Sequence, residues 1–349
     1  MLMHWIKKTK KKIILKKKRN IFLIILAFIV STFFAIILTN YYINKKQKEL
    51  LNSIYESTHK NIFEKTQNLI NDKQNTSLAI AISLSKDETL YTHLKNKDFE
   101  KLNYVKIAKL IETNSKYKNI WIQIFDSNLN SVYRSWTNIR GSLNFRPDLK
   151  KIEALKNIST SISAGLFNIG IRARTPIFDE NNNFYGALEV VTHFDSITED
   201  LVKNNISPVV IGDKSIRKNL TNPLLSKLFI DDYYIANENV DMNLYKYIKE
   251  NGVEKYINID KFIIENGYLI SKYPLFDENK KNLAYIINFM ELKSINLENI
   301  KHIKIQTTLG TVIALIIIFT AILVYYLRDI KYQNSKNKIL LNSQPNIVI

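Results

Sequence analysis

Arginine is the residue whose distribution most suggests binding chemistry in this sequence. Only eight of its 50 basic residues are arginines, yet five of the eight lie within residues 134–174. These five are Arg134, Arg140, Arg146, Arg172 and Arg174. A guanidinium group offers a rigid planar fork of N–H donors that matches a carboxylate or a phosphate. The clustering therefore predicts a site for a small anionic or zwitterionic molecule.

Alternating apolar and polar residues predict the strands that must position these side chains. The alternation covers residues 119–126, 131–137, 159–167, 168–178 and 183–194. Residues two apart on a strand share a face of the sheet. The pairs that share a face in this way are Arg134 with Trp136, Arg172 with Arg174, and Glu189 with His193. The opposite face is apolar and is expected to pack on the long helix that the sequence predicts over residues 44–85.

Two interpretations of the polar face are open. In the first, it lines a ligand pocket. The candidate ligand-binding residues are Trp121, Arg134, Trp136, Arg146, Arg172, Arg174, Glu189 and His193. In the second, it is a solvated face on which arginine and glutamate form structural ion pairs.

An internal repeat helps to locate the site. Residues 173–197 and 271–295 are related by an offset of 98, with seven of 25 positions identical and no gap. Both copies contain the turn P-[IL]-F-D-E-N between two strands. The second copy replaces Arg172, Arg174, Glu189 and His193 by Ile270, Lys272, Ile287 and Glu291. Any small-molecule site is therefore expected in the first copy.

Catalytic, metal and cofactor sites find little support in the sequence. Cysteine is absent, and the five histidines are scattered without metal-ligand spacing. Residues 179–183 begin like a calcium-binding loop, but Phe184 and Val190 occupy the positions that need glycine and glutamate. There is no phosphate-binding G-x-x-x-x-G-K motif. We predict no catalytic residue, no metal and no cofactor.

Two charge-free apolar runs, residues 21–43 and 305–327, frame the rest of the chain. Each is long enough to cross a membrane, which takes about 20 apolar residues; the alternative is two buried core helices. Half of the net charge of +18 lies in residues 1–20, which hold nine bases and no acid. The positive-inside rule then places both termini in the cytoplasm and residues 44–304 outside the cytoplasmic (inner) membrane. Charge concentrated in this way does not indicate a nucleic-acid-binding face.

The outer segment is predicted to be α+β. Residues 44–85 carry apolar residues at helical spacing, which indicates a long helix with a seam suited to a parallel homodimer. A second helix is expected over residues 98–118. The repeat divides the remainder into a membrane-distal module, about residues 98–203, and a proximal module, about residues 204–303.

A long N-terminal helix, two repeated sheets and a membrane span at each end resemble the double Cache sensor domains of bacterial transmembrane receptors, which are tandem PAS-like modules. Residues 121–126 (WIQIFD) and 132–136 (VYRSW) look like the first hairpin of the distal module, and residues 186–191 (GALEVV) look like its last strand. The resemblance covers about residues 44–303. It implies ligand binding in the distal module. Some such domains recognise amino acids through Tyr, Arg-x-Trp-Tyr and Asp, but here Thr137 stands in place of the second tyrosine.

Residues 337–349 resemble the first helix and strand of a cytoplasmic PAS domain. The resemblance implies an output domain beyond residue 349, such as a histidine kinase, a diguanylate cyclase or a chemotaxis domain, and no enzyme within this chain. We therefore expect a membrane sensor that binds a small molecule, with no nucleic-acid partner. The rival hypothesis is a scaffolding membrane protein whose outer domain binds another protein. A third, an extracytoplasmic hydrolase, lacks a nucleophile–base pair.

Overall fold

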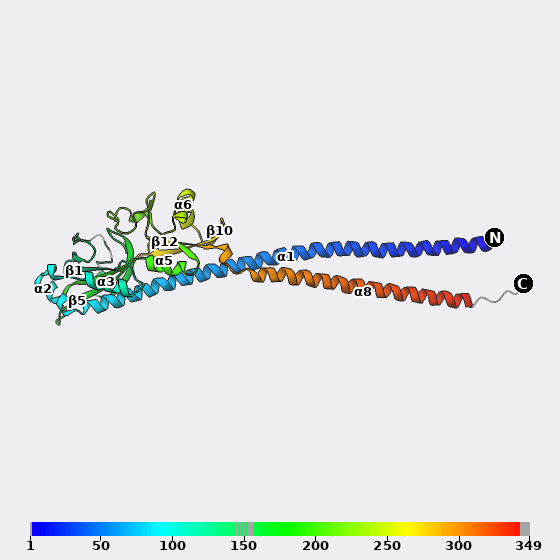
Figure 1. Cartoon of the computed structure of the whole chain (residues 1–349), viewed down its shortest axis with the longest axis horizontal. Helices are drawn as coiled ribbons and strands as arrows, with labels where there is room; N and C mark the ends of the chain where they lie inside the picture. The colour runs from blue at the N-terminus through cyan, green and yellow to red at the C-terminus, as the bar shows by residue number, and fades with distance from the viewer. Residues whose placement is uncertain (1, 144–145, 147, 150, 153–156, 343–349) are drawn as a thin grey trace. The chain divides into compact units, whose positions relative to one another are not determined.

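The computed structural model describes residues 2–143, 146, 148–149, 151–152 and 157–342. The chain forms two compact units, one of residues 55–295 and one of residues 1–54 with 296–349. Helix α1, Leu2–Ser85, runs without interruption through 84 residues (Figure 1). The predicted membrane span at 21–43 and the predicted helix at 44–85 are therefore parts of one helix.

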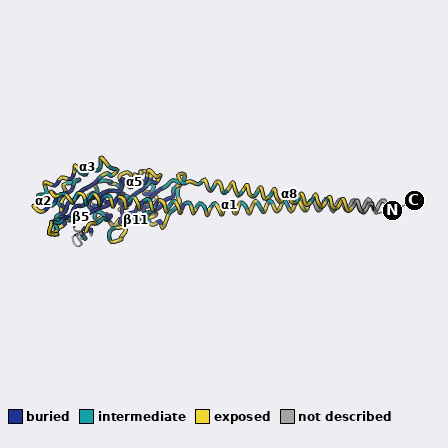
Figure 2. Tube along the Cα trace, turned by 90° about the horizontal axis from the view of Figure 1, so that it is seen from below, coloured by how far each residue is buried: buried dark blue, intermediate teal, exposed yellow. Residues whose placement is uncertain are grey.

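The helical unit contains the first part of α1 and all of α8, which spans Glu298–Asn342. Within the described residues, these are the two helices long and apolar enough to cross a membrane. Their large apolar side chains are exposed, as lipid-facing residues would be (Figure 2). The two helices contact each other through Phe28 and Phe319, whose ring centroids are 5.2 Å apart, and through the hydroxyls of Thr39 and Thr311. The strand expected at the end of the PAS-like start lies outside the described residues.

The distal module is built on a six-stranded antiparallel sheet of order β3-β2-β1-β6-β5-β4. Its strands are β1 (Trp121–Asp126), β2 (Asn130–Arg134), β3 (Gly141–Ser142), β4 (Ser159–Ala164), β5 (Ile169–Phe178) and β6 (Phe184–Thr192). Three short helices precede it: α2 (Glu88–Asn96), η1 (Phe99–Lys101) and α3 (Val105–Asn114). The prediction of one helix over 98–118 is wrong, because extended backbone at Leu102 separates η1 from α3.

The proximal module has a second six-stranded sheet of order β10-β11-β12-β7-β9-β8. Helix α5 (Asp195–Val202) connects β6 directly to the first proximal strand. The strands are β7 (Ile206–Gly212), β8 (Phe229–Ile230), β9 (Tyr233–Ile235), β10 (Phe262–Glu265), β11 (Tyr268–Phe276) and β12 (Asn282–Glu291). The helices are η2 (Lys214–Ile216), α6 (Met242–Asn251), α7 (Val253–Ile257) and η3 (Leu292–Ser294). The α+β prediction is confirmed.

The internal repeat is visible in the strand register. Pro176 pairs with Ala187 across β5 and β6, and Pro274 pairs with Tyr285 across β11 and β12, so the offset of 98 holds on both strands. Each hairpin also has a register shift at the same place, after Ile177 in one and Leu275 in the other. The repeated turn sequence therefore encodes the same hairpin twice.

The apolar face of the distal sheet packs against the helices that precede it. Ile122, Ala173 and Leu188 lie in one cluster with Ala81 of α1 and Leu90 of α2. Further along, α1 contacts both modules: Ser77 bonds to Thr192 of β6, and Thr66 accepts from the amide of Asn288 on β12. The predicted packing of the apolar face on the long helix is confirmed, and the polar face of the distal sheet points to the other side.

Candidate functional site

The strand register brings the predicted polar residues into two rows on one face of the distal sheet. The first row crosses four strands and consists of Arg134, Gln123, Glu189 and Arg174. The second row consists of Trp121, Val191, Arg172 and Ser161. Arg146 reaches the same place from the segment that follows β3. Sequence parity therefore located the face correctly.

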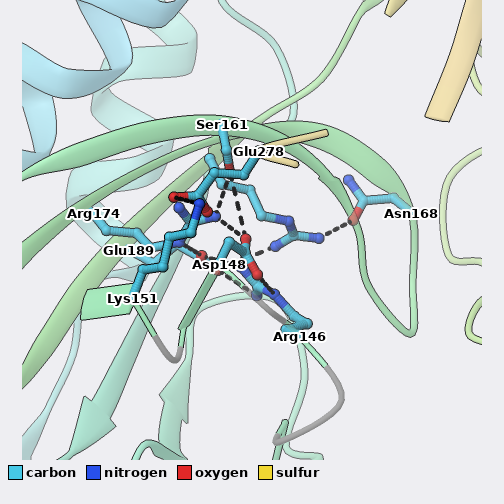
Figure 3. A network of polar contacts seen from close by, with 9 residues as sticks. Arg146, Asp148, Lys151, Ser161, Asn168, Arg174, Glu189 and Glu278 are labelled. Carbon is cyan, nitrogen blue, oxygen red and sulfur yellow. Dashed lines mark hydrogen bonds and ion pairs between the residues drawn. The ribbon is translucent and has the colours of Figure 1, made fainter. Parts of the chain in front are cut away.

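Glu189 is the centre of a buried ion-pair network (Figure 3). Its Oε1 accepts hydrogen bonds from Arg146 Nη1 at 3.0 Å and from Arg172 Nη1 at 3.1 Å. Its Oε2 accepts from Arg146 Nη2 at 2.5 Å and from Arg174 Nε at 2.8 Å. Three guanidinium groups thus share one carboxylate.

Asp148 is the second carboxylate of the network (Figure 3). It receives two hydrogen bonds from Arg146, at 3.2 Å to Oδ1 and 2.8 Å to Oδ2, and Arg174 Nη2 also donates to Oδ2. Arg174 Nη2 donates in addition to the hydroxyl of Ser161 at 2.8 Å. Arg146 and Arg174 are therefore held between two carboxylates.

Burial makes these interactions strong. Glu189 and Arg174 have no exposed surface, and Asp148 is 3% exposed. Burial alone would raise the pKa of Glu189, but the charges of Arg146, Arg172 and Arg174 lower it to about 2. In the same way Arg146 and Arg174 hold the pKa of Asp148 well below its usual value. Both acids are ionised at neutral pH, and Asp148 and Glu189 together raise the pKa of Arg146.

The network carries more positive than negative charge. Four arginines, Arg134, Arg146, Arg172 and Arg174, are buried on this face with only the two carboxylates among the described residues. Burial lowers the pKa of Arg134 and of Arg172 to about 10, with further lowering by neighbouring arginines. Arg134 Nη1 bonds to the carbonyl of Ile139, and Arg172 Nη2 bonds to Asn168 Oδ1 at 3.0 Å. The four arginines thus exceed the two carboxylates by two charges; Arg172 still pairs with Glu189, whereas Arg134 has no ion pair with either carboxylate.

A small cavity of about 10 Å³ lies beside the two arginines. Its polar walls are Gln123, Arg134, Trp136, Arg146 and Arg172, and its apolar walls include Leu166 and Phe167. Gly165 also lines it, and a Cβ atom there would lie 2.7 Å from Arg172 Nη2, so glycine allows that guanidinium its position. The cavity has room for about one water molecule, so a larger ligand requires side chains to move.

The aromatic residues form one wall of the site. The rings of Trp121 and Trp136 stack at 4.5 Å, and His193 meets Trp121 edge-on at 4.4 Å. His193 Nδ1 lies 2.6 Å from the carbonyl oxygen of Asn119, and burial lowers the pKa of His193 to about 3, so the ring is neutral. Trp121 and His193 do not line the cavity; they support Trp136 and the sheet beneath it. The structure thus brings all eight predicted residues together but divides them between network, cavity wall and support.

Four polar residues of the site escaped the sequence analysis: Gln123, Asp148, Ser161 and Asn168. Gln123 could have been found, because it shares strand parity with Trp121 and is a buried polar residue in an apolar strand. Asn168 could also have been found, because it begins the predicted strand 168–178 and shares parity with Arg172. Asp148 lies outside the strands, where no periodicity connects it with the polar face.

The second copy does not reproduce the site. Ile270 and Ile287, at the positions of Arg172 and Glu189, are buried in the apolar core of the proximal module. Lys272, at the position of Arg174, donates to the carbonyl of Ile257 at 2.9 Å. Among the described residues, no group of three His, Asp or Glu side chains could hold a metal ion. The polar face of the distal sheet therefore remains the candidate site.

No protein-family model matches the sequence, and no match was found among curated proteins. Several solved structures are similar. The sensor domain of the histidine kinase DctB from V. cholerae is 13% identical, with a TM-score of 0.41 over 70% of this chain and 98% of that chain. The ligand-binding domain of the Campylobacter jejuni chemoreceptor Tlp3, in complex with 4-methylisoleucine, is 17% identical, with a TM-score of 0.37 over 70% and 95%.

The periplasmic domain of Vibrio cholerae LuxQ is a third similar structure, 13% identical with a TM-score of 0.37 over 66% of this chain and 98% of that chain. The three are thus a sensor domain, a ligand-binding domain and a periplasmic domain. At these identities the function has to be argued from the residues of this chain itself.

Proposed function

We propose that this chain is the input half of a membrane-bound signal-transduction receptor and that its distal module binds a small anionic or zwitterionic metabolite. The observation that carries the proposal is the surplus of positive charge on the buried polar face. A buried charge without a counter-charge is costly, and a charge-assisted bond to a ligand offsets that cost. Arg134 and Arg172, beside the cavity, are the residues to which a ligand would bind.

The signal would pass through the contact between the two modules. Lys151, from the same segment as Arg146 and Asp148, forms an ion pair of 3.2 Å with Glu278 in the β11–β12 turn (Figure 3). A cavity of about 250 Å³ at this contact is lined by Arg146 and Asp148 from the distal side and by Asp277 and Lys281 from the proximal side. Strand β12 continues through η3 into α8. Movement of Arg146 on ligand binding would therefore shift the hairpin that precedes the second apolar helix.

Membrane topology and dimerisation complete the proposal. Both termini would lie in the cytoplasm, with residues 44–304 outside the inner membrane, because of the basic N-terminus and the even number of spans. A parallel homodimer would form along residues 44–58 of α1. From Ile62 onward the apolar seam is already used, since Ile62, Ile70 and Ala81 are buried within the monomer. Leu51 and Ile54 are half-buried and remain available for a partner helix.

The proposal is tested by screening metabolites against the full chain in detergent micelles and recording its thermal unfolding by tryptophan fluorescence. We expect an acid or amino acid to raise the melting temperature of the wild type and to lose this effect in Arg134→Met. Lys272→Met, in the equivalent sheet of the proximal module, is the matched control and should respond like the wild type. A ligand whose effect depends on Lys272 and not on Arg134 would place the site in the proximal module and would contradict the proposal.

A further inference from the structure

Among the described residues that line the small cavity, the buried polar side-chain atoms without a partner are all hydrogen-bond donors. Four of the described residues that line it carry a buried N–H group without a hydrogen-bond partner in the structure. These groups are Gln123 Nε2, Arg134 Nε, Trp136 Nε1 and Arg172 Nε. Gln123, Arg134 and Arg172 are each at most 4% exposed. A ligand placed here meets donors that need acceptors, because unpaired buried donors are costly.

The acceptors nearby are already saturated. Glu189 receives four hydrogen bonds from three arginines, and Asp148 receives bonds from Arg146, Arg174 and Ser161. None of the unpartnered acceptor atoms among the described residues belongs to a residue that lines the cavity. An ammonium group brought here would have to displace a guanidinium from a carboxylate.

The aromatic wall offers no better place for a cation. The faces of Trp121 and Trp136 are stacked on each other, with an angle of 11° between the rings. The guanidinium of Arg134 stands over the ring of Phe167 at 5.4 Å and occupies the cation–π position there. Four buried arginines already outnumber the two carboxylates, so the ammonium group of a ligand would add to this surplus of positive charge.

We infer that the distal site selects a compact organic acid without an ammonium group, and so excludes amino acids. This inference rests on the proposed function and narrows its ligand class. The carboxylate would accept hydrogen bonds from Arg134, Arg172 and the indole N–H of Trp136, which surround the cavity. The small volume of the cavity favours a short carbon chain.

The test uses matched triads of an acid, its α-amino acid and its amide: acetate, glycine and acetamide; propionate, alanine and propionamide; succinate, aspartate and succinamide. The full chain in detergent micelles is titrated with each at constant ionic strength, and melting temperature is recorded. We expect the acid of at least one triad to stabilise the wild type while its amino acid and amide do not. In Arg134→Met, the concentration of acid needed for the same shift should rise about 10- to 100-fold.

The outcomes distinguish two claims: that the distal module holds the ligand site, and that its ligand is an organic acid and not an amino acid. If an amino acid stabilises as strongly as its acid, and loses the effect in Arg134→Met, the ligand class is wrong but the distal sensor site stands. If no member of any triad acts, or if every shift persists in Arg134→Met, both the class and the site are overturned. An amide that stabilises as strongly as its acid would show that the site does not recognise the negative charge. That result would overturn the ligand class and leave the distal site standing.

Discussion

At the scale of single residues, the arginines of the polar face divide into two groups with different tasks. Arg146 and Arg174 are clamped between Glu189 and Asp148 and belong to the fold. Arg134 bonds to one backbone carbonyl and has no ion pair with a carboxylate among the described residues. Arg172 is intermediate, because it pairs with Glu189 and also lines the cavity. Arg146 and Arg174 thus form buried, not solvated, ion pairs, and ligand binding by Arg134 stays a prediction.

Replacing one arginine from each group separates the two tasks. We expect Arg174→Met to lower the free energy of unfolding by about 3–5 kcal/mol, because both buried carboxylates lose an ion-pair partner and the hydrogen bonds that it donates. Arg134→Met should change it by less than about 1 kcal/mol, because it removes a buried charge that lacks a carboxylate partner. Urea denaturation of the two variants measures both values. Equal losses in the two would show that Arg134 is also part of the structural network.

Lys73 on α1 is a buried amine with an unusual environment. Its Nζ donates to Ser196 Oγ at 2.7 Å and lies 3.8 Å from the ring centroid of Tyr117. Burial, with a smaller effect of Lys116, lowers the pKa of Lys73 to about 7. In the unfolded chain the amine keeps its ordinary pKa near 10.5. Between these two values the unfolded state binds the extra proton, so stability must rise with pH.

We therefore expect the free energy of unfolding to increase from pH 7 to pH 9, with a slope approaching about 1.4 kcal/mol per pH unit. Lys73→Met should abolish the slope and stabilise the protein at pH 7, because the buried methionine side chain carries no charge that folding must remove from water. Lys60→Met, at an exposed position on the same helix, is the control and should keep the slope. Urea denaturation at pH 7, 8 and 9 gives the comparison. If the slope persists in Lys73→Met, a titratable group other than Lys73 causes the pH dependence.

At the scale of elements, the repeated hairpin shows what periodicity predicts and what it does not. The turn motif and the offset of 98 predicted that the same hairpin occurs twice, and the strand parity predicted the face that carries the arginines. They could not predict that the arginines would meet Asp148, since that residue comes from a segment without regular spacing. The long helix was predicted in two parts, because its membrane and outer portions differ in composition although their backbone is continuous.

Gly186 is a point where the two copies of the hairpin differ in backbone conformation. Its φ is +152°, and a Cβ atom there would lie 2.0 Å from the carbonyl oxygen of Phe125 on β1. The equivalent residue of the second copy is Ala284, where a Cβ is accommodated. We expect Gly186→Ala to cost about 2–4 kcal/mol of folding free energy, because backbone must move to relieve the clash. Ala284→Gly, the converse change in the other copy, should cost only about 1 kcal/mol. Urea denaturation of both variants measures these losses of folding free energy. Equal losses would mean that β1 and β6 are not in close contact at Gly186.

At the scale of the whole molecule, the order of segments is the prediction that carries the sensor role: a basic start, an apolar helix, two modules and a second apolar helix. We expect a reporter that is active only in the cytoplasm to work when fused after Ile349 and to fail when fused at Asn204. The physical reason is the cost of moving nine bases of residues 1–20 across the membrane. Activity at Asn204 and none at the C-terminus would reverse the topology and place the distal site in the cytoplasm.

The central claim is that a small ligand binds on the polar face of the distal sheet, and the tryptophans there allow a direct measurement. Of the three tryptophans, Trp121 and Trp136 lie at the site, and the third is Trp5 near the N-terminus. In a Trp5→Phe background, titration with the acid found in the screen should change the fluorescence and saturate. Adding Arg134→Met should raise the Kd about 10- to 100-fold, and adding Lys272→Met should leave it unchanged. A Kd that Arg134→Met leaves unaltered, or that only Lys272→Met raises, would contradict the account.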